Sequence, residues 1–430
     1  MSRMGDRTEQ SGLKASLGLF DATAISVGAI VGAGIFVVTG IAAGQAGSAL
    51  VVSMLIAAFI ALFSALSIAE LTACFPREGS VYEFGRELLS PFAGFLSGWM
   101  WMLSNTFTGA AVSLGFAFYF ASLFPGLPTP WVAAVLCLAF TLLNYYGVRQ
   151  SASLNNFLVI AKLLILAFFC VFGMFHVSTS NFVPFLPLQP GVLVGAYFIF
   201  FAYGGFARVA VLAEEVKDAR RIVPRAIILS LVISTVFYIA VGVVAVGLTG
   251  ASNLSNSNSP LAEATSRTGS TAAVQLVSLG GLLATASVLL TSVLGVSRMA
   301  YAMARNGDLP KALSRVHSKH ITPYYSVWLS GVLMALLVLL VDLSSVVAIS
   351  TFAMLFYYAS ANLSALRLSK QRRRYPQTIP IIGTATCLAF LIVIVFLAPQ
   401  AWAIGLAGLI VGTFYYFGKQ RISSRASCSA

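Results

Sequence analysis

The chain has 430 residues, of which 59% are hydrophobic and 9% are charged, and its mean hydropathy is +0.91. So few polar side chains cannot cover a water-soluble globule, which excludes a soluble enzyme and predicts a chain embedded in a lipid bilayer. The net charge of +13 does not indicate nucleic-acid binding, because the Lys and Arg residues lie between apolar runs and form no basic soluble domain.

Apolar runs long enough to cross a bilayer recur along the whole chain. A spanning helix needs roughly 20 apolar residues, so the chain has room for about twelve spans and little else. We therefore predict an all-α polytopic membrane protein with a single domain over residues 1–430. The expected spans are residues 18–42, 48–73, 92–122, 131–147, 154–176, 191–213, 226–249, 271–303, 324–341, 344–366, 379–398 and 400–417.

The charges between the spans predict the orientation. With the N-terminus placed in the cytoplasm, 23 of the 26 Lys and Arg residues fall in inner loops and tails. This asymmetry predicts that both termini, residues 1–17 and 418–430, are cytoplasmic tails at the cell membrane. The one long outer loop, residues 250–270, is rich in Ser and Asn, and we expect it to be mobile.

The first span contains a cluster of glycines near its middle. Gly28, Gly32 and Gly34 fall within seven residues, and each weakens a helix and removes the side chain that shields the backbone. Gly28 and Gly32 also form a small-xxx-small pair of the kind that lets helices pack closely. The local sequence therefore leaves two alternatives, unwinding and close packing.

Lys162 lies in the middle of the fifth span. With a rise of about 1.5 Å per residue, it lies about 12 Å along the helix from Leu154, too deep for its ammonium to reach water easily. A charge buried there is costly unless it has partners or loses its proton. Lys162 is therefore a candidate proton carrier, and the alternative is a permanently charged structural tether.

The sixth span carries a second interruption, Gly204-Gly205, within residues 200–206. Paired interruptions five spans apart indicate two inverted repeats. If both helices unwind at mid-membrane, free N–H groups at a half-helix N-terminus can hold a carboxylate, and free carbonyls can hold an ammonium. A zwitterionic amino acid matches both halves of such a site.

Arg208 follows this interruption in the second half of the sixth span. We favour a structural ion pair with Glu214, Glu215, Asp21 or Glu70 over direct contact with a substrate. If Arg208 faced the substrate instead, acidic solutes would become plausible.

Four segments, in order along the chain, carry a family resemblance. They resemble the GxGIF, AEL with FPxxGG, EEVxNPxRxIPRA and RDGxLP segments of the amino acid-polyamine-organocation (APC) permeases. Here they read GAGIF at residues 32–36, AEL and FPREGS at 69–71 and 75–80, EEVKDARRIVPRA at 214–226, and RNGDLP at 305–310. The chain departs from the pattern at Asp218-Ala219, where the family usually has Asn-Pro, and at Ser80, where a second Gly is common.

The resemblance implies a five-plus-five inverted-repeat (LeuT/APC-type) fold with discontinuous helices 1 and 6. The first repeat would cover residues 18–176, the second residues 191–366, and two extra helices residues 379–417. The family works by alternating access, with the substrate held between helices 1, 3, 6 and 8.

Carried over by position, the resemblance also implies site residues. Amides around Ala33, Gly34 and Ile35 would bind the substrate carboxylate. Carbonyls near Phe201, Ala202 and Gly204 would bind its amine, and Phe201 or Tyr203 would be an aromatic gate unless these rings serve only packing.

The lysine of the fifth span is similar to one in proton-coupled members of the family. In those proteins its ammonium replaces the sodium ion that sodium-coupled relatives hold between helices 1 and 8. Ser287 and Thr291, four residues apart in helix 8, are its possible hydroxyl partners.

We therefore expect a secondary transporter of amino acids, proton-coupled and sodium-independent, whose partners are its substrate, protons and the bilayer. Exchange of amino acids, or transport of another small amine such as a polyamine, is the alternative, although a polycation would need acidic residues at mid-membrane that are not seen. An ion channel or an intramembrane enzyme would need a polar stripe or a catalytic pair that the sequence lacks. We expect no metal or cofactor, since the three His residues show no ligand spacing. The particular amino acid and the oligomeric state are left open.

Overall fold

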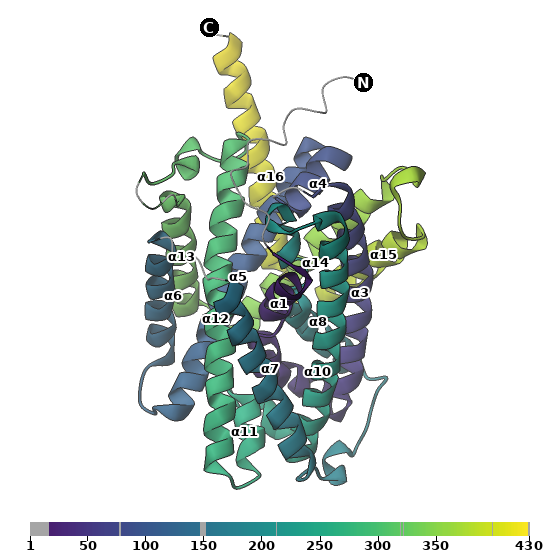
Figure 1. The fold of residues 1–430 in the computed structure, drawn as a ribbon, viewed down its shortest axis with the longest axis vertical. Helices are drawn as coiled ribbons and strands as arrows, with labels where there is room; N and C mark the ends of the chain where they lie inside the picture. Colours follow the sequence, from purple (N-terminus) through teal and green to yellow (C-terminus); the bar gives the residue numbers. More distant parts are fainter. Residues whose placement is uncertain are drawn as a thin grey trace.

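The computed structural model describes residues 17–76, 79–146, 152–211, 213–318, 320, 322–397 and 399–428. In these ranges the chain is helical, and the one extended pairing is an isolated bridge between Leu17 and Val216. Most of the long helices run along the long axis of the molecule, as Figure 1 shows. The prediction of an all-α membrane protein is confirmed.

Twelve helical segments correspond to the twelve predicted spans in the described part of the chain. The first is α1 (Leu19–Ile30), the π-helix η1 (Gly34–Val38) and α2 (Thr39–Ala46), and the sixth is α8 (Pro190–Tyr203) with α9 (Arg208–Val211). The others are α3 (Leu50–Cys74), α5 (Pro91–Leu123), α6 (Thr129–Tyr145), α7 (Ala152–Met174), α10 (Ala219–Ser255), α12 (Thr271–Arg305), α13 (Tyr324–Leu340), α14 (Leu343–Leu366), α15 (Thr378–Leu397) and α16 (Pro399–Cys428).

Shorter helical elements connect these segments. They are η2 (Gly47–Ala49), α4 (Val81–Leu88), η3 (Thr179–Phe182), η4 (Ala213–Glu215), α11 (Pro260–Ser266), η5 (Lys311–Ser314) and η6 (Lys370–Arg372). Side chains cap the N-termini of two of the long helices. The hydroxyl of Ser90 accepts a hydrogen bond from the N–H of Ala93 at 3.1 Å where α5 begins, and the carboxylate of Asp342 accepts one from Ser345 at 3.0 Å where α14 begins.

One loop prediction is wrong. Residues 250–270, expected to form a mobile loop, hold the last turn of α10 and the helix α11. Gly250, with a φ of +76°, bends α10 at this point. Pro260 starts α11, and Leu261 and Ala264 are buried against the bundle. Burial of these few apolar side chains outweighs the loop-like Ser and Asn composition.

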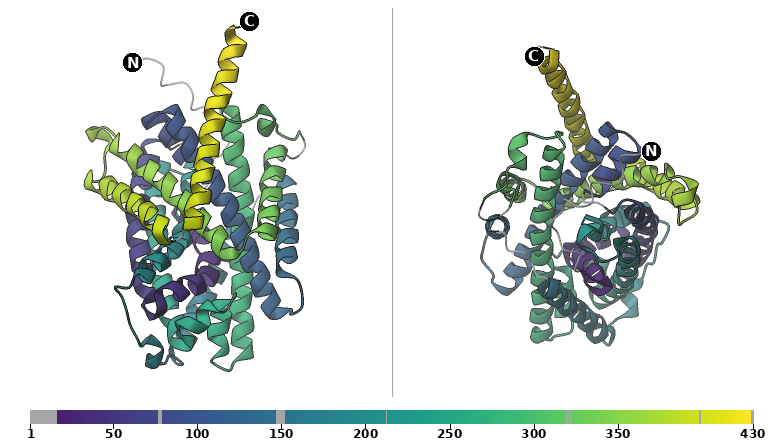
Figure 2. Two further views of the ribbon diagram at one scale, coloured as in Figure 1. Left: turned by 180° about the vertical axis from the view of Figure 1, so that it is seen from behind. Right: turned by 45° about the horizontal axis from the view of Figure 1, so that its top comes forward.

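The interrupted helices lie at the centre of the bundle. In the 18-residue apolar window of the segment formed by α8 and α9, 83% of the residues are buried, whereas 22% are buried in the corresponding window of α15. α1 contacts α7, α10 and α12, and α8 contacts α3 and α14, so the longer helices surround both breaks (Figure 2). α15 and the end of α16 extend from this body.

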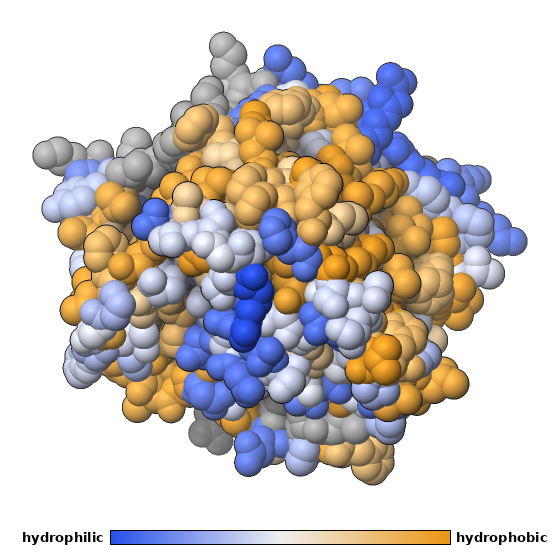
Figure 3. Space-filling model, turned by 90° about the horizontal axis from the view of Figure 1, so that it is seen from below, coloured by the Kyte–Doolittle hydropathy of each residue, from blue (hydrophilic) through white to orange (hydrophobic). Residues whose placement is uncertain are grey.

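The outside of the bundle suits a lipid environment. Large apolar side chains are exposed on its peripheral helices, including Val135, Phe157, Val236 and Ile392. At the end of the molecule that carries α11, a hydrophilic patch lies near the middle, and hydrophobic residues cover much of the surface around it (Figure 3). Among the described residues, eight stretches are long and apolar enough to cross a membrane, and α6 and α13 are shorter apolar helices.

Candidate functional site

The first span is broken where the glycines predict it. The N–H of Val31 bonds to the carbonyl of Val27 at 2.8 Å and closes α1, and regular α-helix returns only at Thr39. Gly32 lies in the non-helical stretch, whereas Gly28 lies inside α1 and faces α7, where an added Cβ would lie 2.8 Å from Val159. The glycines therefore fit both alternatives, since Gly32 lies in the break and Gly28 permits close packing against α7.

The sixth span is broken at Gly204 and Gly205. α8 ends at Tyr203, residues 204–207 form a turn, and the short helix α9 starts at Arg208. The turn is held by main-chain bonds from the N–H of Gly204 to the carbonyl of Phe201 at 3.1 Å and from Arg208 to Gly205 at 3.0 Å. Both interruptions predicted from the sequence are present in the structure.

The two breaks are in direct main-chain contact. A Cβ added to Gly34 would lie 2.4 Å from the Cα of Ala202, and one added to Gly205 would lie 2.2 Å from the carbonyl carbon of Ala29. The Tyr238 hydroxyl, from α10, lies 2.8 Å from the carbonyl oxygen of Ile30 and 3.0 Å from that of Ala202. This hydroxyl joins the end of the first half-helix to the end of α8.

A cavity of about 30 Å³ lies between the breaks. This volume holds one or two water molecules, so a larger solute enters only if side chains around it move. The lining residues come from six α-helices, from η1 and from the two breaks: Ala29, Ile30, Gly32, Ala33, Gly34, Asn105, Thr108, Val112, Phe201, Ala202, Gly204, Gly205, Arg208, Val288, Met354 and Tyr357.

Five of the seven predicted substrate residues line this cavity. They are Ala33, Gly34, Phe201, Ala202 and Gly204. The other two do not line it: Ile35 is buried in η1, and the ring of Tyr203 packs against Tyr238 with centroids 5.0 Å apart. Of the two aromatic candidates for a gate, only Phe201 borders the cavity.

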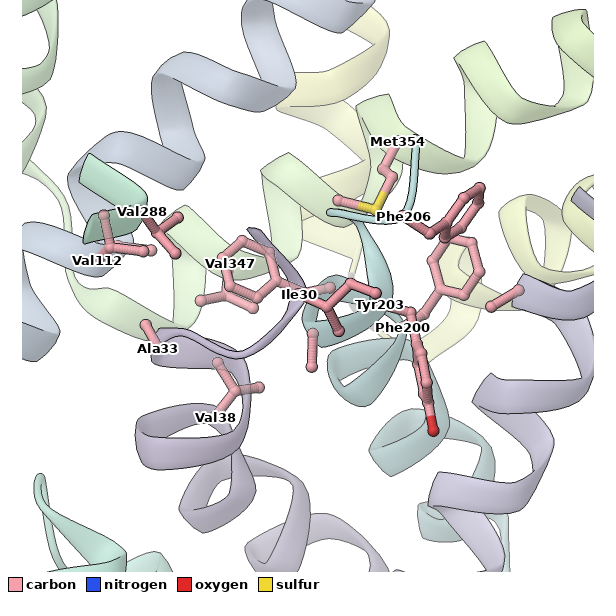
Figure 4. Packing of buried hydrophobic residues seen from close by; sticks show 14 of the residues in the cluster. Ile30, Ala33, Val38, Val112, Phe200, Tyr203, Phe206, Val288, Val347 and Met354 are labelled. Carbon is pink, nitrogen blue, oxygen red and sulfur yellow. The ribbon is translucent and has the colours of Figure 1, made fainter. Parts of the chain in front are cut away.

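Sequence reasoning missed the wall opposite the breaks. Asn105, Thr108 and Val112 of α5, Val288 of α12, and Met354 and Tyr357 of α14 form this wall. Figure 4 shows Val112 and Val288 side by side and Met354 next to Phe206. Asn105 and Thr108 are polar residues in an apolar run, a signal that could have marked α5, whereas the valines and Met354 resemble any core residue.

The predicted amine acceptors already have hydrogen-bond partners. The carbonyl of Phe201 accepts from Gly204, that of Ala202 from the Tyr238 hydroxyl, and that of Gly204 from the Tyr358 hydroxyl at 3.1 Å. A carbonyl oxygen has two lone pairs, so each of the three keeps room for a second donor.

Lys162 reaches from α7 to the first break. Its side chain is 1% exposed, and its Nζ donates to the carbonyls of Gly28 at 2.9 Å and Val31 at 3.1 Å and to the Ser287 Oγ at 2.9 Å. Three acceptors satisfy the three donors of an ammonium. The carbonyl end of α1 also carries the negative end of the helix dipole, which favours a cation.

The two hydroxyls of α12 differ in their contacts. Ser287 contacts Lys162, and its own hydroxyl donates to the carbonyl of Ala284 at 2.9 Å. The Thr291 hydroxyl lies 3.3 Å from the carbonyl of Ser287 and 3.0 Å from that of Val288, both in its own helix. The structure therefore brings Ser287, and not Thr291, to the lysine.

Arg208 does not form the expected ion pair with any carboxylate whose side chain the structure describes. Its guanidinium donates to the Thr291 carbonyl and the Asn105 Oδ1, each at 3.2 Å, and lies 6.0 Å from the centre of the Trp101 ring. The predicted acidic partners are engaged elsewhere. Asp21 accepts from Asn156, Glu70 from the N–H groups of Arg374 and Tyr375, and Glu215 lies 3.7 Å from Arg298. The Glu214 side chain lies outside the described residues.

Comparison with known proteins shows that the chain is similar to transporters over almost its whole length. The family described as amino acid permease matches residues 17–416, which include both breaks, Lys162 and Arg208. The chain is 32% identical to the branched-chain amino acid permease BcaP of Bacillus subtilis, over 97% of this chain and 95% of the relative. It is 35% identical to an uncharacterized transporter of Mycobacterium tuberculosis, over 96% and 93% of the two chains. It is 30% identical to the methylthioribose transporter of Bacillus subtilis, over 97% and 96%.

Proposed function

The chain belongs to the amino acid permease family, and from this premise we propose that it is a secondary active transporter that moves amino acids across the cell membrane by alternating access. The observation that carries the proposal is the contact between two broken helices beside one small cavity. Free main-chain groups inside a lipid-embedded bundle are costly unless a ligand uses them. A zwitterion carries one positive and one negative group, so it can bind both to main-chain carbonyls and to main-chain N–H groups.

The substrate carboxylate would bind at the start of η1. The first amides of a helix have no acceptor within that helix, and those of Ala33, Gly34 and Ile35 lie at this end. The amine would bind at the end of α8, where the carbonyls of Phe201, Ala202 and Gly204 each keep a lone pair. Phe201 is the residue that we propose as the aromatic gate, because it is the one of the two candidates that lines the cavity.

Lys162 would couple transport to protons. A protonated Lys162 links three helices, since its bonds join α7 to the broken end of α1 and to Ser287 of α12. Loss of the proton removes the charge and one donor, which frees the end of α1 to move. Because the ammonium uses the acceptors between α1 and α12 that a sodium ion would need, we propose sodium-independent transport.

The arrangement of the chain in the membrane is also part of the proposal. We propose that residues 18–176 and 191–366 are inverted repeats, each starting with a broken span, and that residues 379–417 are additional. The C-terminal end of α16 and the basic segments 306–318 and 367–377 lie at the same end of the bundle (Figure 1), which supports a cytoplasmic location for this end.

The proposed transport can be tested with the purified chain in proteoliposomes. Labelled amino acids are expected to accumulate when an inward proton gradient is imposed, with no requirement for sodium. Empty vesicles are the control for leakage. Accumulation driven only by a sodium gradient would contradict the proton coupling, and the absence of amino acid uptake in either gradient would contradict the proposed function.

The two α12 hydroxyls offer a matched pair of variants for the lysine contact. Ser287→Ala removes an acceptor from a charged donor, which costs about 1.5–3 kcal/mol, so we expect pH-driven uptake to fall roughly tenfold or more. Thr291→Val removes a hydroxyl one turn away that does not contact Lys162, and we expect uptake within about twofold of the parent chain. Initial uptake rates measure the difference, and equal effects in both variants would argue against the proposed coupling.

A further inference from the structure

We propose that the cavity selects amino acids whose side chain carries a carboxylate, and that Arg208 is the residue that binds this second carboxylate. The inference rests on the proposed function and adds a substrate class to it. The proposal depends on four features of the site, which are the place of Arg208, its partners, the polarity of the cavity wall, and the room that one glycine makes.

Arg208 supplies a permanent positive charge to a site whose lining residues include no Asp or Glu. A guanidinium stays protonated in proteins, so it cannot become neutral to avoid the cost of burial. Its observed partners are all neutral: one main-chain carbonyl, one amide oxygen and one indole ring. A buried cation is most stable beside an anion, and a carboxylate in the cavity would supply one.

The guanidinium keeps donors for a ligand. It has five N–H donors in a planar fork, and its two protein hydrogen bonds, both at 3.2 Å, are at the long end of the usual range. The remaining N–H groups can bind a carboxylate through two parallel bonds.

The polar part of the wall lies where a substrate side chain would extend. The breaks of α1 and α8 would hold the main-chain carboxylate and amine, so the side chain would point to the wall made by α5, α9, α12 and α14. That wall pairs Arg208 with the polar side chains of Asn105, Thr108 and Tyr357. Asn105 and Thr108 already have hydrogen-bond partners within the protein. A purely apolar substrate side chain would therefore leave the charge of Arg208 without a counter-charge, at a cost.

Gly295 of α12 makes room for the guanidinium. A Cβ added at Gly295 would lie 2.7 Å from Nη1 of Arg208 and 3.1 Å from Cη2 of Trp101. The first of these atoms is the far end of a flexible side chain, so Gly295→Ala would move the guanidinium and leave its charge intact. This variant therefore tests whether the position of the Arg208 charge matters when the charge itself is kept.

Two isosteric pairs of labelled substrates test the proposal in proteoliposomes: aspartate with asparagine, and glutamate with glutamine. Each pair differs in charge and hardly in shape. We expect the parent chain to prefer the acidic member of at least one pair by about 10- to 100-fold in initial uptake rate at low concentration, the effect of a charge-assisted bidentate contact. Arg208→Gln should abolish this preference, and Arg208→Lys, a point charge without the fork, should retain part of it.

Arg298→Gln is the matched control. Arg298 also belongs to the second proposed repeat. Its guanidinium lies 3.7 Å from the carboxylate of Glu215, and it does not line the cavity. We expect the acidic-to-amide ratio to stay unchanged in this variant. Gly295→Ala should lower the ratio even if Arg208→Gln does not fold, and substrate-induced shifts in Tm provide a second measurement that does not depend on transport.

Two results would overturn the inference and leave the proposed function standing: a parent chain that takes up the neutral member of both pairs better, or Arg208→Gln reducing both members of a pair equally. The second result would mean that Arg208 serves only as a brace between α9, α5 and α12. If the parent chain transports no amino acid at all, the proposed function and the inference both fail.

Discussion

Lys162→Ala is expected to abolish accumulation of substrate driven by a proton gradient while the protein stays folded. Among the described residues, the variant removes the only lysine, histidine or carboxylate side chain that hydrogen-bonds to the first break, so proton movement is no longer coupled to the transport cycle. It leaves the carbonyls of Gly28 and Val31 without this donor, but it also removes a charge that is costly to bury, so the net change in stability is small.

Uptake in proteoliposomes with and without the gradient measures this effect. Exchange of labelled for unlabelled substrate at equal pH should remain detectable in Lys162→Ala, because exchange needs binding and alternation but no net proton movement. Lys311→Ala, which changes a lysine in the exposed η5, is the control and should behave like the parent chain. Undiminished pH-driven accumulation in Lys162→Ala would refute the proton-carrier role and favour the tether.

The breaks and the lysine were predictable because their causes are local. A glycine cluster weakens any helix that contains it, wherever that helix packs, so Gly32 and Gly204 indicated interruptions without knowledge of their neighbours. A lysine in the middle of an apolar run has few places to put its charge, so Lys162 stood out in the same way. Local physical costs of this kind can be read from one sequence.

The rest of the cavity wall depends on tertiary packing and could not be predicted. Val112 and Val288 face the cavity, whereas Val135 and Val236, of the same type and in similar apolar runs, are exposed on the outside of the bundle. A helix that is apolar on every face gives no periodic signal for which face turns inward.

The ion pair predicted for Arg208 is absent among the described carboxylates for a related reason. Glu215 is only seven positions away in the sequence, but it lies next to Arg298 of α12, so it does not neutralise Arg208. Proximity along the chain does not predict which charges meet once a helix is broken and turned.

Gly34→Leu is expected to eliminate substrate binding, and the structure changes the reason for this expectation. The family resemblance implies that the amide of Gly34 binds the substrate carboxylate, so an added side chain would be expected to fill that site. In the structure the Cβ position of Gly34 points at α8, 2.4 Å from both the Cα and the Cβ of Ala202. Even Gly34→Ala must therefore force the two breaks apart, at a cost of about 1–3 kcal/mol for overpacking.

Gly204→Ala provides the contrast that separates packing from binding. Its added Cβ would meet the flexible end of Met354, 2.3 Å from Cε and 2.8 Å from Sδ, so the side chain can move and the main chain can stay in place. Because both residues border the cavity, we expect Gly204→Ala to weaken substrate binding with little change in stability. Gly34→Ala and Gly34→Leu should lose both stability and binding.

Thermal unfolding of the purified variants, with and without substrate, measures both quantities, because a ligand that binds the folded state raises Tm by more when it binds more tightly. Gly418→Ala, at a helical position in α16 with open space around the added Cβ, is the matched control and should change neither. If Gly34→Ala kept the parent Tm and the parent substrate shift, the two breaks would have to move apart at no cost. The binding site could then not depend on their contact, and main-chain groups held together by glycine would not explain how a zwitterion is bound.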